Sequence, residues 1–103
     1  MLKHIVLLQF KSDITQEEIN NVFLEIAQLK NSIPAMKSYT YGVNCSIEQL
    51  NKGFTHGFVM DFEDIIGRNN YVNHPEHNRV AQQVILPVLE HGFDSVIVLD
   101  YEF

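Results

Sequence analysis

Four apolar runs are separated by amphipathic stretches along the chain. The runs Lys3–Phe10, Met36–Val43, Phe54–Phe62 and Phe93–Tyr101 have lengths typical of β-strands. The alternation is clearest in the third run, where every second residue from Phe54 onward is phenylalanine, histidine or methionine. The pattern predicts four strands.

A helix is predicted between the first two strands. Thr15 and Glu18 have the spacing of a capping box, in which two side chains satisfy backbone N–H groups at a helix start. Apolar residues then recur at helical spacing from Ile19 to Ile33. Pro34 is expected to end the helix, because the residue before a proline avoids the helical conformation.

Two more helices are predicted between the third and fourth strands. The segment Asp64–Asn73 forms the first, and Pro75 is well placed to open the second, because a proline is favoured at the first helical position. Pro87 is expected to kink this helix, since it lacks an N–H group and crowds the preceding turn. Gly92 is expected to end it.

The order of these elements predicts an α+β fold of one domain, residues 1–103. Strand, helix, strand, strand, two helices and strand form a split βαβ, the ferredoxin-like four-stranded antiparallel sheet with its helices on one face. Val96 and Val98 alternate with Ile97 and Leu99, so the last strand is apolar on both faces, as the first strand largely is. A second copy of the chain is the simplest cover for the face without helices, which predicts a homodimer.

Composition and charge exclude several classes of partner. The net charge is −6, and the seven lysines and arginines are scattered, whereas nucleic acids and anionic membranes require clustered cations. The single cysteine, Cys45, cannot form an internal disulfide. No signal-peptide pattern and no apolar stretch of about 20 residues is found, so we expect a cytoplasmic protein.

Four short motifs occur in order along the chain. They are Lys3-His4-Ile5-Val6, Ile33-Pro34-Ala35-Met36, Thr55-His56-Gly57-Phe58 and Tyr71-Val72-Asn73-His74-Pro75-Glu76-His77. With these motifs, the chain resembles the stress-responsive dimeric α/β-barrel (Dabb) family nearly from end to end, from Lys3 to Tyr101. The resemblance implies a homodimer in which two four-stranded sheets face each other.

The resemblance also implies a candidate active site. A plant branch of the family includes a polyketide cyclase that closes a ring on a linear β-keto substrate without an organic cofactor. Its acid–base tyrosine and histidine match Tyr71 and His77 in this sequence. The expected substrate-binding residues are His4, His56, Phe23, Ile26, Phe58 and Val88, and the cyclase carries different residues at the positions of Ile26, Phe58 and Val88.

The spacing of Tyr71 and His77 has its own consequence. The two lie six residues apart, on either side of Pro75, so they would not share a face of one continuous helix. A bend at Pro75 could bring them within hydrogen-bond reach, about 2.6–3.2 Å, directly or through one water. They would then form an acid–base pair, or simply satisfy each other at a buried junction between helices.

The two remaining pocket histidines are expected at opposite ends of the cavity. His4 and His56 both stand near the beginnings of neighbouring antiparallel strands. This separation argues against a shared zinc ion, which requires short bonds from both imidazoles. The resemblance further implies a structural Mg²⁺ held by the backbone carbonyls of Lys30, Ile33 and Met36. Water or the chain itself could equally satisfy those carbonyls at the helix end.

Three functions fit these observations. The first is a cofactor-independent lyase or cyclase that binds a small apolar or β-keto molecule in an internal cavity. The second is a non-catalytic stress-response or small-molecule-binding module that uses the same cavity. The third is an oxygen-using monooxygenase of the same fold. The four polar side chains His4, His56, Tyr71 and His77 favour a cavity with polar groups, but they do not identify the ligand.

Overall fold

Alternating apolar residues build an antiparallel sheet in the computed structural model, which describes residues 1–103. The strand order is β2–β3–β1–β4, and every neighbouring pair is antiparallel. This is the ferredoxin-like arrangement that the order of elements predicts, and the prediction is confirmed. The strands are β1 (Leu2–Leu8), β2 (Ser38–Val43), β3 (His56–Phe62) and β4 (Val96–Glu102).

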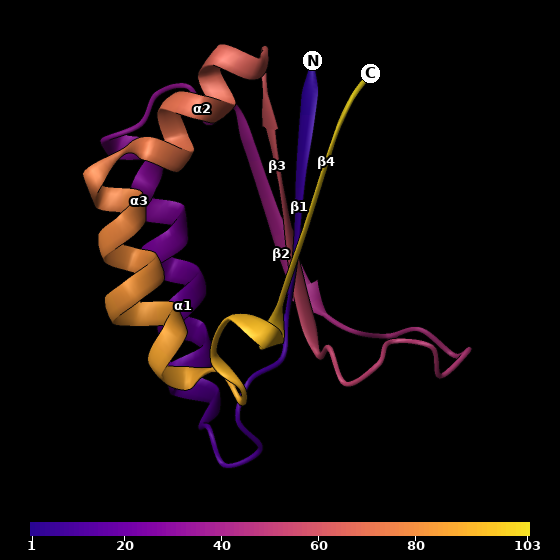
Figure 1. Cartoon of the computed structure of the whole chain (residues 1–103). Coiled ribbons are helices and arrows are strands. Elements are labelled where there is room, and N and C mark those ends of the chain that lie inside the picture. The colour runs from indigo at the N-terminus through magenta and orange to yellow at the C-terminus, as the bar shows by residue number, and fades with distance from the viewer.

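The helices all lie on one face of this sheet (Figure 1). The predicted capping box is formed: the Thr15 side chain accepts a hydrogen bond from the Glu18 N–H, and the Glu18 side chain accepts one from the Thr15 N–H. Asp64 caps the next helix by accepting from the Gly67 N–H at 2.8 Å. The helices are α1 (Gln16–Gln28), followed by a 3₁₀ turn η1 (Leu29–Asn31), then α2 (Ile65–Asn73) and α3 (Pro75–Arg79).

The chain after α3 differs from the sequence prediction. The helix continues as a π-helical turn η2 (Val80–Ile85), in which the Leu86 N–H donates to the Ala81 carbonyl five residues earlier. Pro87 does not kink an α-helix, because it lies in the following 3₁₀ turn, η3 (Leu86–Val88). The helical segment therefore ends before Leu89, which is extended.

Gly92 does not end a helix, and the last strand begins later than predicted. Gly92 adopts a φ of 59°, a conformation that favours glycine, and opens a 3₁₀ turn, η4 (Gly92–Ser95). The buried Ser95 holds this turn, because its hydroxyl accepts from the His91 N–H at 2.9 Å. Its carbonyl accepts from the Gln9 N–H, so Phe93 is in the turn and β4 starts at Val96.

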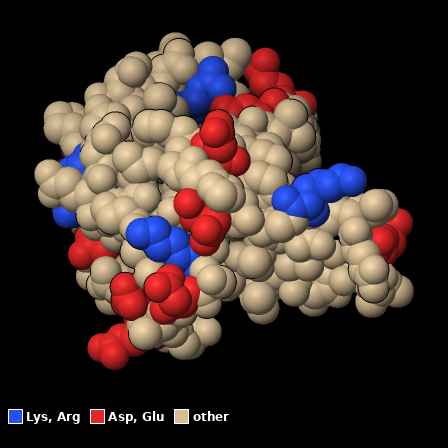
Figure 2. Space-filling view, turned by 60° about the horizontal axis from the view of Figure 1, so that its bottom comes forward, with Lys and Arg blue, Asp and Glu red and all other residues tan.

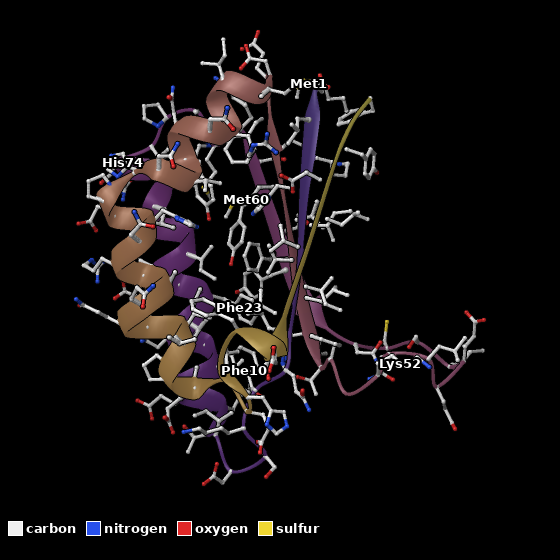
Figure 3. The ribbon with its side chains drawn as sticks, viewed as in Figure 1. Met1, Phe10, Phe23, Lys52, Met60 and His74 are labelled. Atoms are coloured by element: carbon white, nitrogen blue, oxygen red, sulfur yellow. The ribbon has the colours of Figure 1, made fainter.

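The core lies between the helices and the inner face of the sheet. Phe10, Phe23 and Met60 point into this layer (Figure 3) and are buried. The outer face has no helix against it, and Ile97 and Leu99 of β4 keep 43% and 59% of their surface exposed there. Both faces of the sheet are thus apolar, but the chain covers only one of them.

The surface agrees with the scattered charge of the sequence. On the face that Figure 2 shows, lysine and arginine side chains are separated from one another, and acidic side chains lie between them. No helix is long and apolar enough to cross a membrane. The connection between β2 and β3, which includes Lys52, projects away from the two layers (Figures 1 and 3).

The capping box provides a test of how α1 begins. Thr15→Ala removes the side-chain acceptor for the Glu18 N–H, and we expect it to lower the free energy of unfolding by about 1 kcal/mol. Thr15→Ser keeps the hydroxyl and should retain most of the stability. Urea unfolding of the three proteins measures this, and equal midpoints for Thr15→Ala and wild type would contradict the cap.

Candidate active site

A cavity of about 280 Å³ lies between the helices and the inner face of the sheet. Phe93 and Val98 line it but remain 64% and 55% exposed, so the cavity opens to solvent beside β4. Fifteen of its 17 lining residues are hydrophobic, which makes it suited to an apolar ligand. The lining residues are His4, Val6, Leu8, Ile26, Leu29, Phe58, Tyr71, Val72, His77, Val80, Ala81, Ile85, Leu86, Leu89, Phe93, Val96 and Val98.

Three side chains with polar atoms meet in this lining. The Tyr71 ring lies 4.6 Å from the His77 ring and 5.8 Å from the His4 ring, measured between centroids. A bend at His74 brings Tyr71 and His77 together, because His74 ends α2 and its Nδ1 accepts from the Glu76 N–H at 3.0 Å to begin α3. The sequence placed these two residues on either side of a turn, and the turn folds them against each other.

The contact between Tyr71 and His77 is a ring contact. The two rings are tilted by 56°, and no direct hydrogen bond joins the Tyr71 hydroxyl to the imidazole. The expected direct hydrogen bond is therefore absent, while a link through one water stays a prediction. The Nδ1 atom of His77 is buried and has no hydrogen-bond partner within the protein. A buried polar atom without a partner lowers stability, so a structural role for the ring does not account for its position.

Burial sets the protonation of both groups. Desolvation is the main cause that lowers the pKa of His77, and the nearby His4 and His74 lower it further. The polar groups of the Val72 backbone and the Asn78 side chain oppose this lowering of the pKa only in part. Desolvation also raises the pKa of Tyr71. At neutral pH the pair therefore consists of a neutral imidazole, which can accept a proton, and a neutral hydroxyl, which can donate a hydrogen bond.

His4 has charged partners that sequence reasoning missed. Its Nδ1 lies 2.7 Å from Oδ1 of Asp100, and Oδ2 of Asp100 accepts from Nη1 of Arg68 at 2.6 Å. His4 and Asp100 are directly opposite each other in the pairing of β1 with β4. The sequence held one signal for this contact: Val96, Val98 and Asp100 alternate along β4, so Asp100 shares the inner face with the two valines.

Three of the expected substrate-binding residues lie outside this cavity, whereas His4, Ile26 and Phe58 line it. His56 and Phe23 pack together near the far end of the sheet: the His56 ring is 5.9 Å from Phe23 and 5.0 Å from Phe10. Val88 borders a surface groove instead. The π-helical turn before it changes the number of residues per turn, and so changes which side chains face inward.

The expected separation of the two histidines is present in the sheet. His4 is opposite Met60 and His56 is opposite Leu8, so the two are at opposite ends of the β1–β3 pair. No three His, Cys, Asp or Glu side chains converge as metal ligands. At the predicted Mg²⁺ position, the Ile33 carbonyl already accepts from the Met36 N–H at 3.2 Å. The site formed by the carbonyls of Lys30, Ile33 and Met36 stays a prediction.

Comparison with known proteins places these features in a family. The model of the Stress responsive A/B Barrel Domain (Dabb) family matches residues 2–103. The chain belongs to this family. It is also 34% identical, over 98% of its length and 88% of the relative's, to the stress-response A/B barrel domain-containing protein HS1 of Arabidopsis thaliana.

Enzymes are among the similar proteins. Olivetolic acid cyclase of Cannabis sativa is 33% identical over 97% of this Dabb chain and 94% of its own length. The structure of a hydroxynitrile lyase from Passiflora edulis superposes with a TM-score of 0.84 and 26% identity, covering 97% of this chain and 90% of that one. A dimeric ferredoxin-like protein from Jannaschia sp. shares the fold, with a TM-score of 0.86, 24% identity, and coverage of 99% and 98%.

The lowered pKa of His77 has a consequence for stability. The unfolded chain takes up a proton near the ordinary histidine pKa of 6.5, whereas the folded chain takes it up only at lower pH. Folding stability should therefore fall as the pH drops from about 7.5 to about 5.5. His77→Gln should weaken this dependence. Because burial also lowers the pKa of His56, the double variant with His56→Gln should weaken it further. Urea unfolding across this range measures it, and an unchanged slope in His77→Gln would contradict the assignment.

Proposed function

We propose that this Dabb protein is a homodimeric enzyme whose cavity binds a small apolar or β-keto molecule and performs cofactor-independent lyase or cyclase chemistry beside a carbonyl group. The observation that carries the proposal is the ring contact between His77 and Tyr71 in the lining of a cavity whose other walls, apart from His4, are apolar. A neutral imidazole and a neutral hydroxyl side by side are the minimum that such chemistry needs.

Each residue of the pair has a role that follows from its protonation. Neutral His77 accepts the proton from the carbon next to the carbonyl, and the electron pair moves onto the carbonyl oxygen. The Tyr71 hydroxyl donates a hydrogen bond to the resulting enolate oxygen. The apolar walls lower the local dielectric constant, which strengthens both interactions. Similarity to one protein named a cyclase and another named a lyase supports this class of reaction.

The size and chemistry of the cavity limit the ligand. A volume of about 280 Å³ suits a small molecule rather than a peptide. With histidine and tyrosine as the only polar side chains in the lining, the ligand should carry an apolar body and few polar atoms. Native mass spectrometry of freshly purified protein is the direct way to find such a ligand.

The homodimer follows from the uncovered face of the sheet. Ile5 is paired with Leu99 and Leu7 with Ile97 on the side away from the helices, which leaves an apolar surface exposed. Such a patch is typical of a protein interface. The dimeric state of the similar Jannaschia protein supports a second copy as the cover.

The catalytic proposal is tested by removing each polar group of the pair. Against a panel of β-keto and polyketide-like substrates, His77→Ala should lower the rate about 10²–10⁴-fold through loss of the base. Tyr71→Phe should lower kcat about 10²-fold while ligand binding persists, because only the hydroxyl is lost. His91→Ala, an exposed histidine outside the cavity, is the matched control and should keep wild-type activity.

The same panel separates enzyme from binding module. A rate that is indifferent to both substitutions would refute the mechanism. If wild type binds members of the panel but turns none over, and both variants shift affinity only modestly, the non-catalytic function is the correct one. Circular dichroism of each variant verifies that the fold is intact before rates are compared.

The dimer is tested on the outer face of β4. We expect wild type to sediment as a dimer at micromolar concentration, and Ile97→Asp to sediment as a folded monomer, because a buried unpaired charge is costly. Leu24→Asp, on the exposed side of α1, is the matched control and should remain dimeric. A monomeric wild type, or equal behaviour of the two variants, would contradict the interface.

A further inference from the structure

The third polar side chain of the cavity, His4, has no role in the reaction described above. It is buried, with 7% of its side chain exposed, yet it is hydrogen-bonded through one ring nitrogen only. Nδ1 contacts Asp100 at 2.7 Å, whereas Nε2 has no partner within the protein. The ring lines the same cavity as Tyr71, which lies 5.8 Å away.

The partner of Nδ1 determines where the proton of His4 sits. An ionised carboxylate can only accept hydrogen bonds, so the atom that faces Asp100 must carry the hydrogen. The other oxygen of Asp100 is held by the Arg68 guanidinium at 2.6 Å, which balances the carboxylate charge and fixes its orientation. In the neutral form of the ring, with the hydrogen on Nδ1, Nε2 carries a lone pair.

We propose that Asp100 is a positioning residue that holds His4 as the Nδ1–H tautomer, and that Nε2 binds a ligand group that donates a hydrogen bond, a hydroxyl or an enol. The ligand class is thus an apolar molecule with a hydroxyl or enol near one end. This deepens the proposed function and rests on it for the use of the cavity. The assignment of the tautomer requires no substrate.

The register of the sheet supports the role of Asp100 as a positioning residue for His4. His4 and Asp100 are directly paired residues of β1 and β4, and both side chains are on the inner face. Arg68 reaches Asp100 from α2, the helix that also carries Tyr71. The same short helix therefore supplies Tyr71 to the cavity lining and Arg68, which fixes the orientation of Asp100 on β4.

Nuclear magnetic resonance of the ¹⁵N-labelled histidine rings in their neutral form tests the tautomer. The His4 signals, assigned by their loss in His4→Phe, should show a protonated Nδ1 and an unprotonated Nε2. Asp100→Leu removes the acceptor and should move the proton to Nε2, whereas Asp100→Asn keeps an acceptor oxygen and should preserve the pattern. Asp13→Leu, an exposed acid remote from the cavity, is the control.

Two results would overturn the assignment of the tautomer. One is a proton on Nε2 of His4 in the wild type, which decides the matter even if a variant fails to fold. The other is an Asp100→Leu spectrum with the wild-type His4 pattern. Neither depends on turnover, so failure here is distinct from failure of the Tyr71–His77 mechanism.

Binding of two probes tests the ligand class. Wild type should prefer 1-naphthol, which has a donor, over 1-methylnaphthalene, which has the same shape without one. The ratio of their dissociation constants should fall about tenfold in His4→Phe, where the acceptor is lost. No binding of 1-naphthol to wild type, or an unchanged ratio in His4→Phe, would overturn the ligand assignment.

Discussion

The pairing of β1 with both β3 and β4 is the constraint on which the rest of this structure depends. β1 is central, and its register places His4 between Met60 on one side and Asp100 on the other. Side chains alternate between the two faces of the sheet. A shift of one residue in the register of β1 would therefore turn His4 to the outer face and bury the side chains that now face outward. The core, the cavity wall and the uncovered face all follow from this one alignment.

The helices complete the cavity through departures from regular geometry. The break at His74 and Pro75 turns the chain so that α2 and α3 direct Tyr71 and His77 to the same place. The π-helical turn that follows supplies three of the apolar lining residues, Val80, Ala81 and Ile85. Irregular helical turns of this kind are frequent at functional sites, because they direct side chains where a regular helix cannot.

The Dabb cavity combines a large apolar surface with few polar atoms. In such surroundings a hydrogen bond to an imidazole nitrogen is stronger than it would be at the surface, so a ligand that makes one gains more affinity. The same desolvation keeps His77 neutral and Tyr71 protonated. Burial is thus the main cause of the protonation states of the pair, whereas the orientation of His4 depends on Asp100, which Arg68 holds.

Local signals in the sequence were sufficient for most elements. These signals depend on residues close in sequence: the capping box at Thr15, Pro34 after the first helix and the alternation in β3. The predicted elements formed with shifts at their ends. The segment from Val80 to Ser95 was predicted less well. Its form depends on distant contacts, such as the hydrogen bond from Gln9 to Ser95, which no local pattern records.

The sequence by itself determined the fold class and the two apolar faces of the sheet, and it indicated that a bend at Pro75 could bring Tyr71 and His77 together. Only the tertiary structure decided which expected residues share one cavity. It placed His56 and Phe23 at the other end of the sheet and added Asp100 and Arg68 beside His4. Alternation determines the face on which a side chain lies, but its neighbours along that face are set by strand register and helix packing, which depend on contacts across the whole chain.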